Sequence, residues 1–103
     1  MRPVRIRPEA DRDVDAASAF LQQDGAPEAA LRLLDEFEAA LKRIAASPAI
    51  GSPRYEPLLK GLRFWKLRRH PYLVFYVAHP GFVDVLRVLH AARDIPAELQ
   101  ESC

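Results

Sequence analysis

The chain has 103 residues, of which 50% are hydrophobic and 28% are charged. This length and balance indicate one globular domain, residues 1–103, and exclude a disordered tail. The longest uncharged apolar run, 71–78, is far shorter than the roughly 20 residues that a membrane-spanning helix needs. Charges throughout the first twelve residues leave no apolar region for a signal peptide, so we expect a cytoplasmic protein. The single Cys103 has no partner for an intramolecular disulfide.

The net charge of +1 hides an uneven distribution. Residues 9–53 carry nine acidic and four basic side chains, whereas residues 54–103 carry eight basic and five acidic ones. Six of those eight bases lie between Arg54 and Arg69. This clustering predicts a cationic patch that meets an anionic partner, either nucleic acid or an acidic protein segment. A merely solvated basic face explains the same pattern equally well.

The first half of the chain predicts a short strand and two helices. Residues 4–7 alternate like a strand, and Pro8 ends it. Apolar residues then recur at helical spacing, which predicts a helix from Glu9 to the turn at 23–25 and a second helix from Pro27 to Ser47. The apolar stripe of the second helix contains Ala30, Leu34, Phe37, Leu41 and Ile44, with Leu33 and Ala40 beside it. Two helices joined by so short a link fold back as an antiparallel hairpin.

The second half predicts an ordered loop at 47–61 and then a β-meander. Its strands are 62–68, 72–78 and 82–89, and short turns separate them. Residues 91–103 form a tail with one helical turn near Ile95. The predicted fold class is therefore α+β: a first strand, an α-helical hairpin, and a three-stranded antiparallel meander.

The turn at 79–82 suggests how the strands pair. It places Ala78 opposite Val83 and Arg87 opposite Val74. We expect the helices to cover the face that carries Leu73, Phe75, Val77, Leu86 and Val88, together with Trp65 and Leu67. The other face then carries Phe64, Lys66, Arg68, Tyr72, Tyr76 and Arg87. A monomer does not leave so many apolar groups in water, so we predict that an acidic amphipathic segment of a partner protein covers this face.

Several segments are similar to a known family. Residues 7–10 resemble its S/T-P-E-A entry to the first helix, with Arg7 in place of the hydroxyl cap. Residues 61–63 and 71–76 resemble its central strands, and 85–94 is similar to the ParE-type ending ILRVLHxARD. Over nearly the whole chain, the order of elements and these motifs resemble the RelE/ParE toxin superfamily of bacterial type II toxin–antitoxin modules. The resemblance implies that fold, and a toxin that a cognate antitoxin neutralises.

Two activities occur on this fold, according to the resemblance. RelE-like members cleave messenger RNA on the ribosome, and ParE-like members poison DNA gyrase. For RNA cleavage, Lys66, Arg68 and Arg87 would hold the phosphate and His90 would transfer the proton. The tail after Ile95 has no aromatic residue, which favours the ParE-like branch. A decayed, non-toxic module is a third interpretation.

The resemblance to the ParE-like branch also implies partners and contact residues. The expected partners are a ParD-like antitoxin and DNA gyrase, and the expected effects are growth arrest and plasmid stabilisation. The residues expected to contact antitoxin or target are Phe64, Lys66, Arg68, Tyr72, Tyr76, Arg87 and Arg93.

Other kinds of site are not expected. His70 and His79 lie at opposite ends of one strand, about 30 Å apart, and cannot share a metal ion. His70 and His90 can approach one another, but arginines crowd them, so we predict no metal site and no cofactor. His90 lies on the core side of its strand, which favours a packed structural histidine. Both helices are acidic outside, so we expect no sequence-specific DNA binding.

Overall fold

The computed structural model describes residues 1–102, and Cys103, with the prediction made for it, lies outside them. Over the described residues the chain forms four strands, three α-helices and two short 3-10 turns at Pro48–Ile50 and Glu56–Leu58. The elements are β1 Val4–Ile6, α1 Pro8–Gln23, α2 Pro27–Ala46, β2 Leu62–Lys66, β3 Tyr72–His79, β4 Phe82–His90 and α3 Ile95–Ser102. No helix within residues 1–102 is long and apolar enough to cross a membrane.

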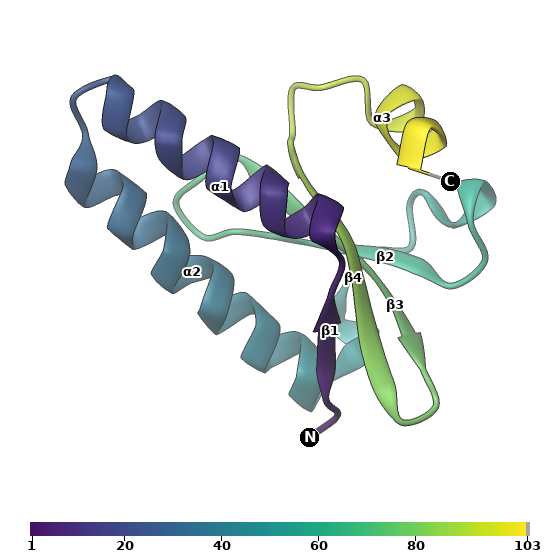
Figure 1. Ribbon diagram of the computed structural model, residues 1–103. Helices are drawn as coiled ribbons and strands as arrows, with labels where there is room; N and C mark the ends of the chain where they lie inside the picture. The colour runs from purple at the N-terminus through teal and green to yellow at the C-terminus, as the bar shows by residue number, and fades with distance from the viewer. Residues whose placement is uncertain (103) are drawn as a thin grey trace.

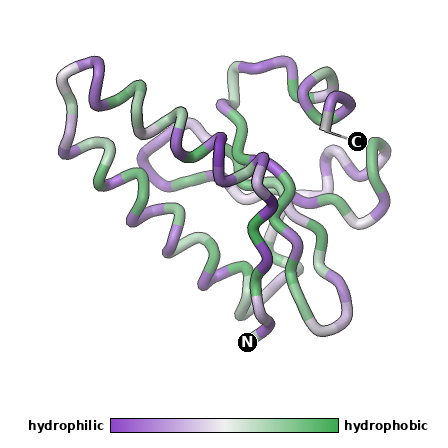
Figure 2. Tube along the Cα trace, in the orientation of Figure 1, coloured by the Kyte–Doolittle hydropathy of each residue, from purple (hydrophilic) through white to green (hydrophobic). Residues whose placement is uncertain are grey.

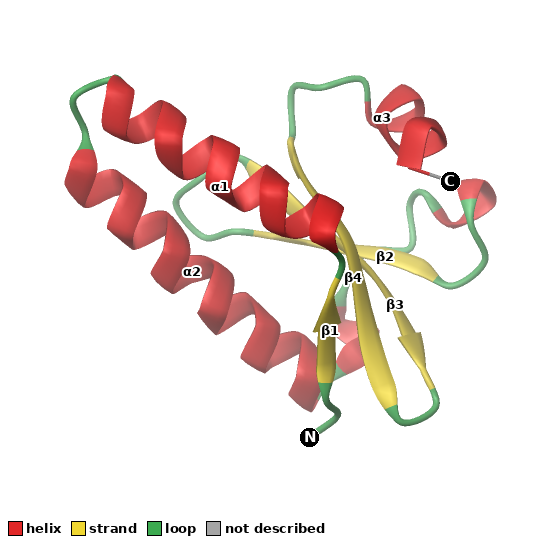
Figure 3. Ribbon diagram, viewed as in Figure 1, coloured by secondary structure: helices red, strands yellow, loops and turns green. Residues whose placement is uncertain are grey.

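The four strands form one mixed sheet in the order β1-β4-β3-β2. β2, β3 and β4 are antiparallel neighbours, which confirms the meander. β1 pairs with β4 in parallel, a neighbour that the sequence did not indicate. The α1–α2 hairpin lies against one face of this sheet, whereas α3 lies at its other side (Figures 1 and 3). The α+β class is therefore confirmed, with a four-stranded mixed sheet in place of a pure meander.

The helices begin and end where the sequence predicts. Pro8 and Pro27 occupy the first turns of α1 and α2, where a missing N–H is tolerated. Both helices alternate between hydrophobic and hydrophilic residues along their length (Figure 2). One position of the predicted stripe is wrong, because Leu33 is 2% exposed and Leu34 is 38% exposed.

The predicted faces of the meander are reversed along β3 and at Leu86 of β4, whereas the predicted faces of β2 and of Val88 are confirmed. The helices cover Trp65, Tyr72, Val74, Tyr76, Val85 and Val88, and the opposite face carries Phe64, Leu73, Phe75, Val77, Leu86 and Leu89. The reason for the reversal is that residues 72–78 are apolar on both sides, so neither face carries a polar marker. The register also differs because of a β-bulge: Tyr76 pairs with Val85, but Phe75 pairs with Arg87, so Leu86 has no partner across the strand. This extra residue shifts the register by one, and Val74 therefore lies opposite Val88 instead of Arg87. The burial of Trp65 on the helix side is confirmed.

The second face is not open, contrary to expectation. Residues 95–102 form α3 instead of a tail, and Ile95 and Leu99 are only 3% and 5% exposed. They pack on Leu73, Phe75 and the rest of that apolar face, together with Tyr55 from the preceding loop. The apolar surface that we expected a partner protein to cover is therefore covered by this chain itself.

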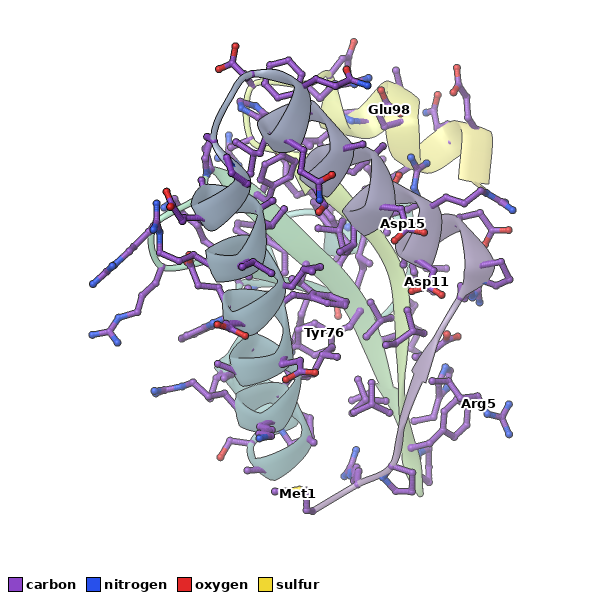
Figure 4. The ribbon with its side chains drawn as sticks, turned by 60° about the vertical axis from the view of Figure 1, so that its left-hand side comes forward. Met1, Arg5, Asp11, Asp15, Tyr76 and Glu98 are labelled. Carbon is purple, nitrogen blue, oxygen red and sulfur yellow. The ribbon has the colours of Figure 1, made fainter. Side chains whose placement is uncertain are left out.

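Tyr76 is the largest fully buried side chain of the described residues. Its hydroxyl donates to the Pro48 carbonyl at 2.6 Å and accepts from the Gly51 N–H at 2.9 Å. A Cβ atom at Gly51 would collide with this hydroxyl, so the loop needs glycine there. Burial raises the pKa of Tyr76 despite the Gly51 N–H bond. Figure 4 shows Tyr76 beside α2. Tyr76 therefore anchors the 48–51 segment, and its expected place on an open face is wrong.

We predict that Tyr76→Phe lowers the free energy of unfolding by about 2 kcal/mol, because two buried main-chain groups lose their partner. Urea denaturation measures the change, and Tyr55→Phe is the matched control, since the Tyr55 hydroxyl makes no hydrogen bond within residues 1–102. Equal losses in the two variants would contradict the anchoring role of Tyr76.

A second polar contact fixes the turn between β2 and β3 to α2. The Glu36 carboxylate accepts from the Arg69 N–H at 2.6 Å and lies 2.6 Å from Nδ1 of His70. Burial by itself would raise the pKa of Glu36, but these hydrogen bonds and the charges of His70 and Arg69 lower it overall. The ionised carboxylate therefore stabilises the fold.

This contact predicts a pH dependence. Because the pKa of Glu36 is lowered in the fold, its contribution is complete at neutral pH and is lost as the pH falls through that lowered value. We expect Glu36→Gln to be about 1 kcal/mol less stable than the parent at neutral pH, and the difference to disappear as the pH falls through the lowered pKa of Glu36. Thermal unfolding across this range tests the prediction, and a difference that stays constant with pH would refute it.

Candidate functional site

A cleft of about 470 Å³ lies between α1, the ends of β3 and β4, and α3. We call it the α1–β4 cleft. It brings together four of the residues singled out from the sequence, namely Tyr72, Arg87, His90 and Arg93. Phe20 from α1 forms its rim and is 63% exposed. The cleft is therefore the candidate functional site.

The floor of the cleft is an ion pair between Asp13 of α1 and Arg87 of β4. Arg87 Nε donates to Asp13 Oδ2 at 2.7 Å, and Nη2 donates to Oδ1 at 2.9 Å. Asp13 Oδ2 also accepts from the Val88 N–H at 2.9 Å. That N–H is available because β1 pairs with β4 only as far as Val85. One carboxylate therefore satisfies both the guanidinium and the open edge of β4 just beyond the bulge.

Arg87 also joins α3 to this floor. Its Nη1 donates to the Glu98 carbonyl at 3.4 Å, and its Nη2 lies 3.7 Å from Glu98 Oε2. Arg93 binds Glu98 Oε1 at 3.0 Å. The hydrogen bond with Asp13 raises the pKa of Arg87, against the effect of burial. Two carboxylates thus surround Arg87, and a phosphate group arriving there would face both of them.

The walls of the cleft are aromatic. The rings of Tyr72 and His90 meet edge to face, with centroids 5.2 Å apart. His90 Nδ1 accepts a hydrogen bond from the Ala92 N–H at 3.0 Å, which fixes its ring at the end of β4. Exposed Phe20 and exposed Arg93 complete the rim. Aromatic residues and arginine beside a fixed polar floor are typical of protein-contact surfaces.

The remaining predicted site residues lie elsewhere. Phe64 packs between Tyr55 and Phe75, with ring centroids 5.9 and 5.6 Å away. Lys66 and Arg68 are exposed at the end of β2 and in the following turn. The expectation of one shared face is therefore wrong.

Sequence analysis missed the contributions of Asp13, Phe20 and Glu98 to the cleft. An acidic residue such as Asp13 near the start of a helix fits the helix dipole, and Phe20 fits the apolar spacing of the same helix, so neither residue indicates a site by its sequence position. No local signal links Asp13 to Arg87, 74 residues away. Within residues 1–102, no group of three or more histidine, cysteine and acidic side chains could hold a metal ion.

The fold of this chain is similar to that of a known protein. A solved structure described as the chromosomal ParDE TA system from P. aeruginosa has the same fold, with a TM-score of 0.74 over 87% of this chain and 96% of that chain. At 22% identity this likeness defines the fold alone. A search of curated proteins found no match.

The family is defined by a second match. The model of the ParE toxin of type II toxin–antitoxin systems (parDE) matches residues 4–95. The chain therefore belongs to the ParE toxin family, and the resemblance to the RelE/ParE superfamily is confirmed.

The cleft floor makes a prediction about stability. Asp13→Asn removes the charge that Arg87 and the Val88 N–H share, and we expect it to lower the free energy of unfolding by about 2 kcal/mol. Asp15→Asn is the matched control on the same helix, because Asp15 is exposed, and its effect should stay within about 0.5 kcal/mol. Chemical denaturation compares the two variants. Equal effects would show that the Asp13–Arg87 pair does not hold α1 to β4.

Proposed function

We propose that this ParE-family toxin inhibits DNA gyrase when free and that a cognate ParD-like antitoxin neutralises it. The observation that carries the proposal is the family match over residues 4–95. Growth arrest of the host, stabilisation of a plasmid that carries the module, and a cytoplasmic location belong to the same proposal.

The α1–β4 cleft supports contact with a protein target. Its rim offers an exposed phenylalanine and an arginine, which are enriched among the residues that dominate binding energy at interfaces. Its floor is held by ion pairs, so the rim residues are presented on a rigid base. We assign Phe20, Tyr72 and Arg93 to target contact, and Arg87 to holding that surface in shape.

The proposal also sets aside the phosphate-binding role considered for Arg87. In the fold its guanidinium is bound by Asp13 and Glu98, so its charge is already neutralised. Lys66 and Arg68 lie beyond the cleft lining and form a separate cationic surface at the end of β2. This arrangement favours a protein target over RNA cleavage at Arg87.

A supercoiling assay with purified gyrase tests the proposal. We expect the free protein to inhibit supercoiling and to leave cleaved DNA. Phe20→Ser should weaken inhibition about tenfold or more, because it removes a large aromatic contact from the rim. Leu31→Ser is the matched control, since both side chains are 63% exposed and Leu31 lies on α2, away from the cleft.

Three outcomes would contradict parts of this proposal. Normal supercoiling together with fragmented messenger RNA in cells would replace gyrase with a ribonuclease activity. Harmless expression without antitoxin would indicate a decayed module. Equal loss of inhibition in Phe20→Ser and Leu31→Ser would leave gyrase as the target but would remove the cleft as its contact surface.

A further inference from the structure

The outer edge of β1 is an unpaired sheet edge. On its inner side, Val83 N–H donates to the Pro3 carbonyl at 2.8 Å and Arg7 N–H donates to the Val85 carbonyl at 3.0 Å. In a parallel pair these bonds use alternate residues, so the main-chain groups of Val4 and Ile6 point away from β4. Within residues 1–102, the backbone hydrogen bond between the end of α2 and this edge lies at Arg2, whose N–H donates to the Ala45 carbonyl. The stretch from Val4 to Ile6 is therefore open.

The side chains along this edge alternate in character. Ile6 lies on the helix side, paired with Val85, and is 38% exposed. Arg5 lies on the opposite side, with its guanidinium 4.6 Å from the centre of the Phe82 ring, and projects from the edge in Figure 4. Arg7 binds Asp84 at 2.9 Å on that same side. A hollow beside Arg5 and Phe82 adds room for a side chain.

Natural proteins usually protect such edges by covering, bulging or shortening them. Here the strand is short, but within residues 1–102 no element covers its outer side between Val4 and Ile6. We infer that this edge is a docking site for an extended segment of another polypeptide, which adds as a fifth strand and alternates apolar with acidic residues. Its main chain would bond to Val4 and Ile6, as in other cases of strand addition.

The alternation of the segment follows from the pleat of the sheet. Every second side chain of an added strand lies on the helix side, where Ile6 offers an apolar neighbour. The intervening side chains lie beside Arg5, where a carboxylate is favoured and a cation is disfavoured. A second copy of this chain would place arginine against arginine, and duplex DNA has no peptide groups to pair with Val4 and Ile6. An acidic polypeptide segment therefore fits best, whether or not gyrase is the target.

The test uses the full-length protein and a capped seven-residue peptide of alternating glutamate and valine. We expect saturable binding and slowed hydrogen exchange at the Val4 and Ile6 amides. A lysine–valine peptide of the same length should bind about tenfold more weakly or not at all. Sedimentation in the same buffer should show that the protein does not pair with itself through this edge.

Two variants separate the edge from a general charge effect. Ile6→Pro removes an outward N–H but keeps the bonds of Arg7 and Pro3 to β4, and we expect about fivefold weaker binding. Arg5→Glu should reverse the preference toward the lysine–valine peptide, whereas Arg32→Glu, exposed on α2, should leave both affinities unchanged.

Four results would overturn the inference. These are equal binding of the two peptides, protection of amides other than those of Val4 and Ile6, displacement of the acidic peptide by duplex DNA, and dimers formed through β1. Each of them can occur with gyrase inhibition intact, so failure here is distinct from failure of the proposed function.

Discussion

The contact of Asp13 with Arg87 and the Val88 N–H determines how the rest of this toxin is arranged. It lies where β4 has just passed a bulge at Leu86 and lost its pairing with β1. A bulge changes the direction of a side chain and leaves main-chain groups without partners in the sheet. Here the Asp13 carboxylate of α1 accepts hydrogen bonds from both the Arg87 guanidinium and the Val88 N–H. The same guanidinium reaches Glu98, so α3 is tied to the floor that holds α1.

The bulge also resets which side chains of β4 face the hairpin. Beyond Leu86 the alternation of β4 is reset, and Val85 and Val88 both lie under the helices. Phe75 and Leu89 are left on the other side, where Ile95 and Leu99 cover them. The apolar layers on both sides of the sheet therefore belong to this chain.

Much of the fold could be predicted from residues that act locally. Pro8 and Pro27 mark the helix starts, and the glycine-containing turn at 79–82 fixes the β3–β4 pairing near the hairpin. The faces could not be predicted, because residues 72–78 are apolar on both sides and neither parity carries a polar marker. No glycine or proline signals the bulge at Leu86, so the error in register began there.

In the candidate site, too, some residues could be predicted from the sequence and others could not. Tyr72, Arg87, His90 and Arg93 could be singled out, because a family motif and the meander pattern place them at the end of two strands. Their partners could not, because Asp13 meets Arg87 across 74 residues and nothing local distinguishes it from the other acids of α1. Tyr76 was placed on the wrong face because its hydroxyl bonds to the main chain of the 48–51 loop, and that loop has no regular sequence pattern that would indicate the contact.

A double-mutant cycle on Asp13 and Arg87 is the most direct test of this account. Asp13→Asn, Arg87→Met and the double variant are compared with the parent by urea denaturation, and the coupling free energy is obtained from the four unfolding free energies. If this contact holds α1 and α3 to β4, the coupling should be about 2 kcal/mol in favour of the pair. A coupling below about 0.5 kcal/mol would mean that the two residues act independently and that the arrangement of the cleft has another cause.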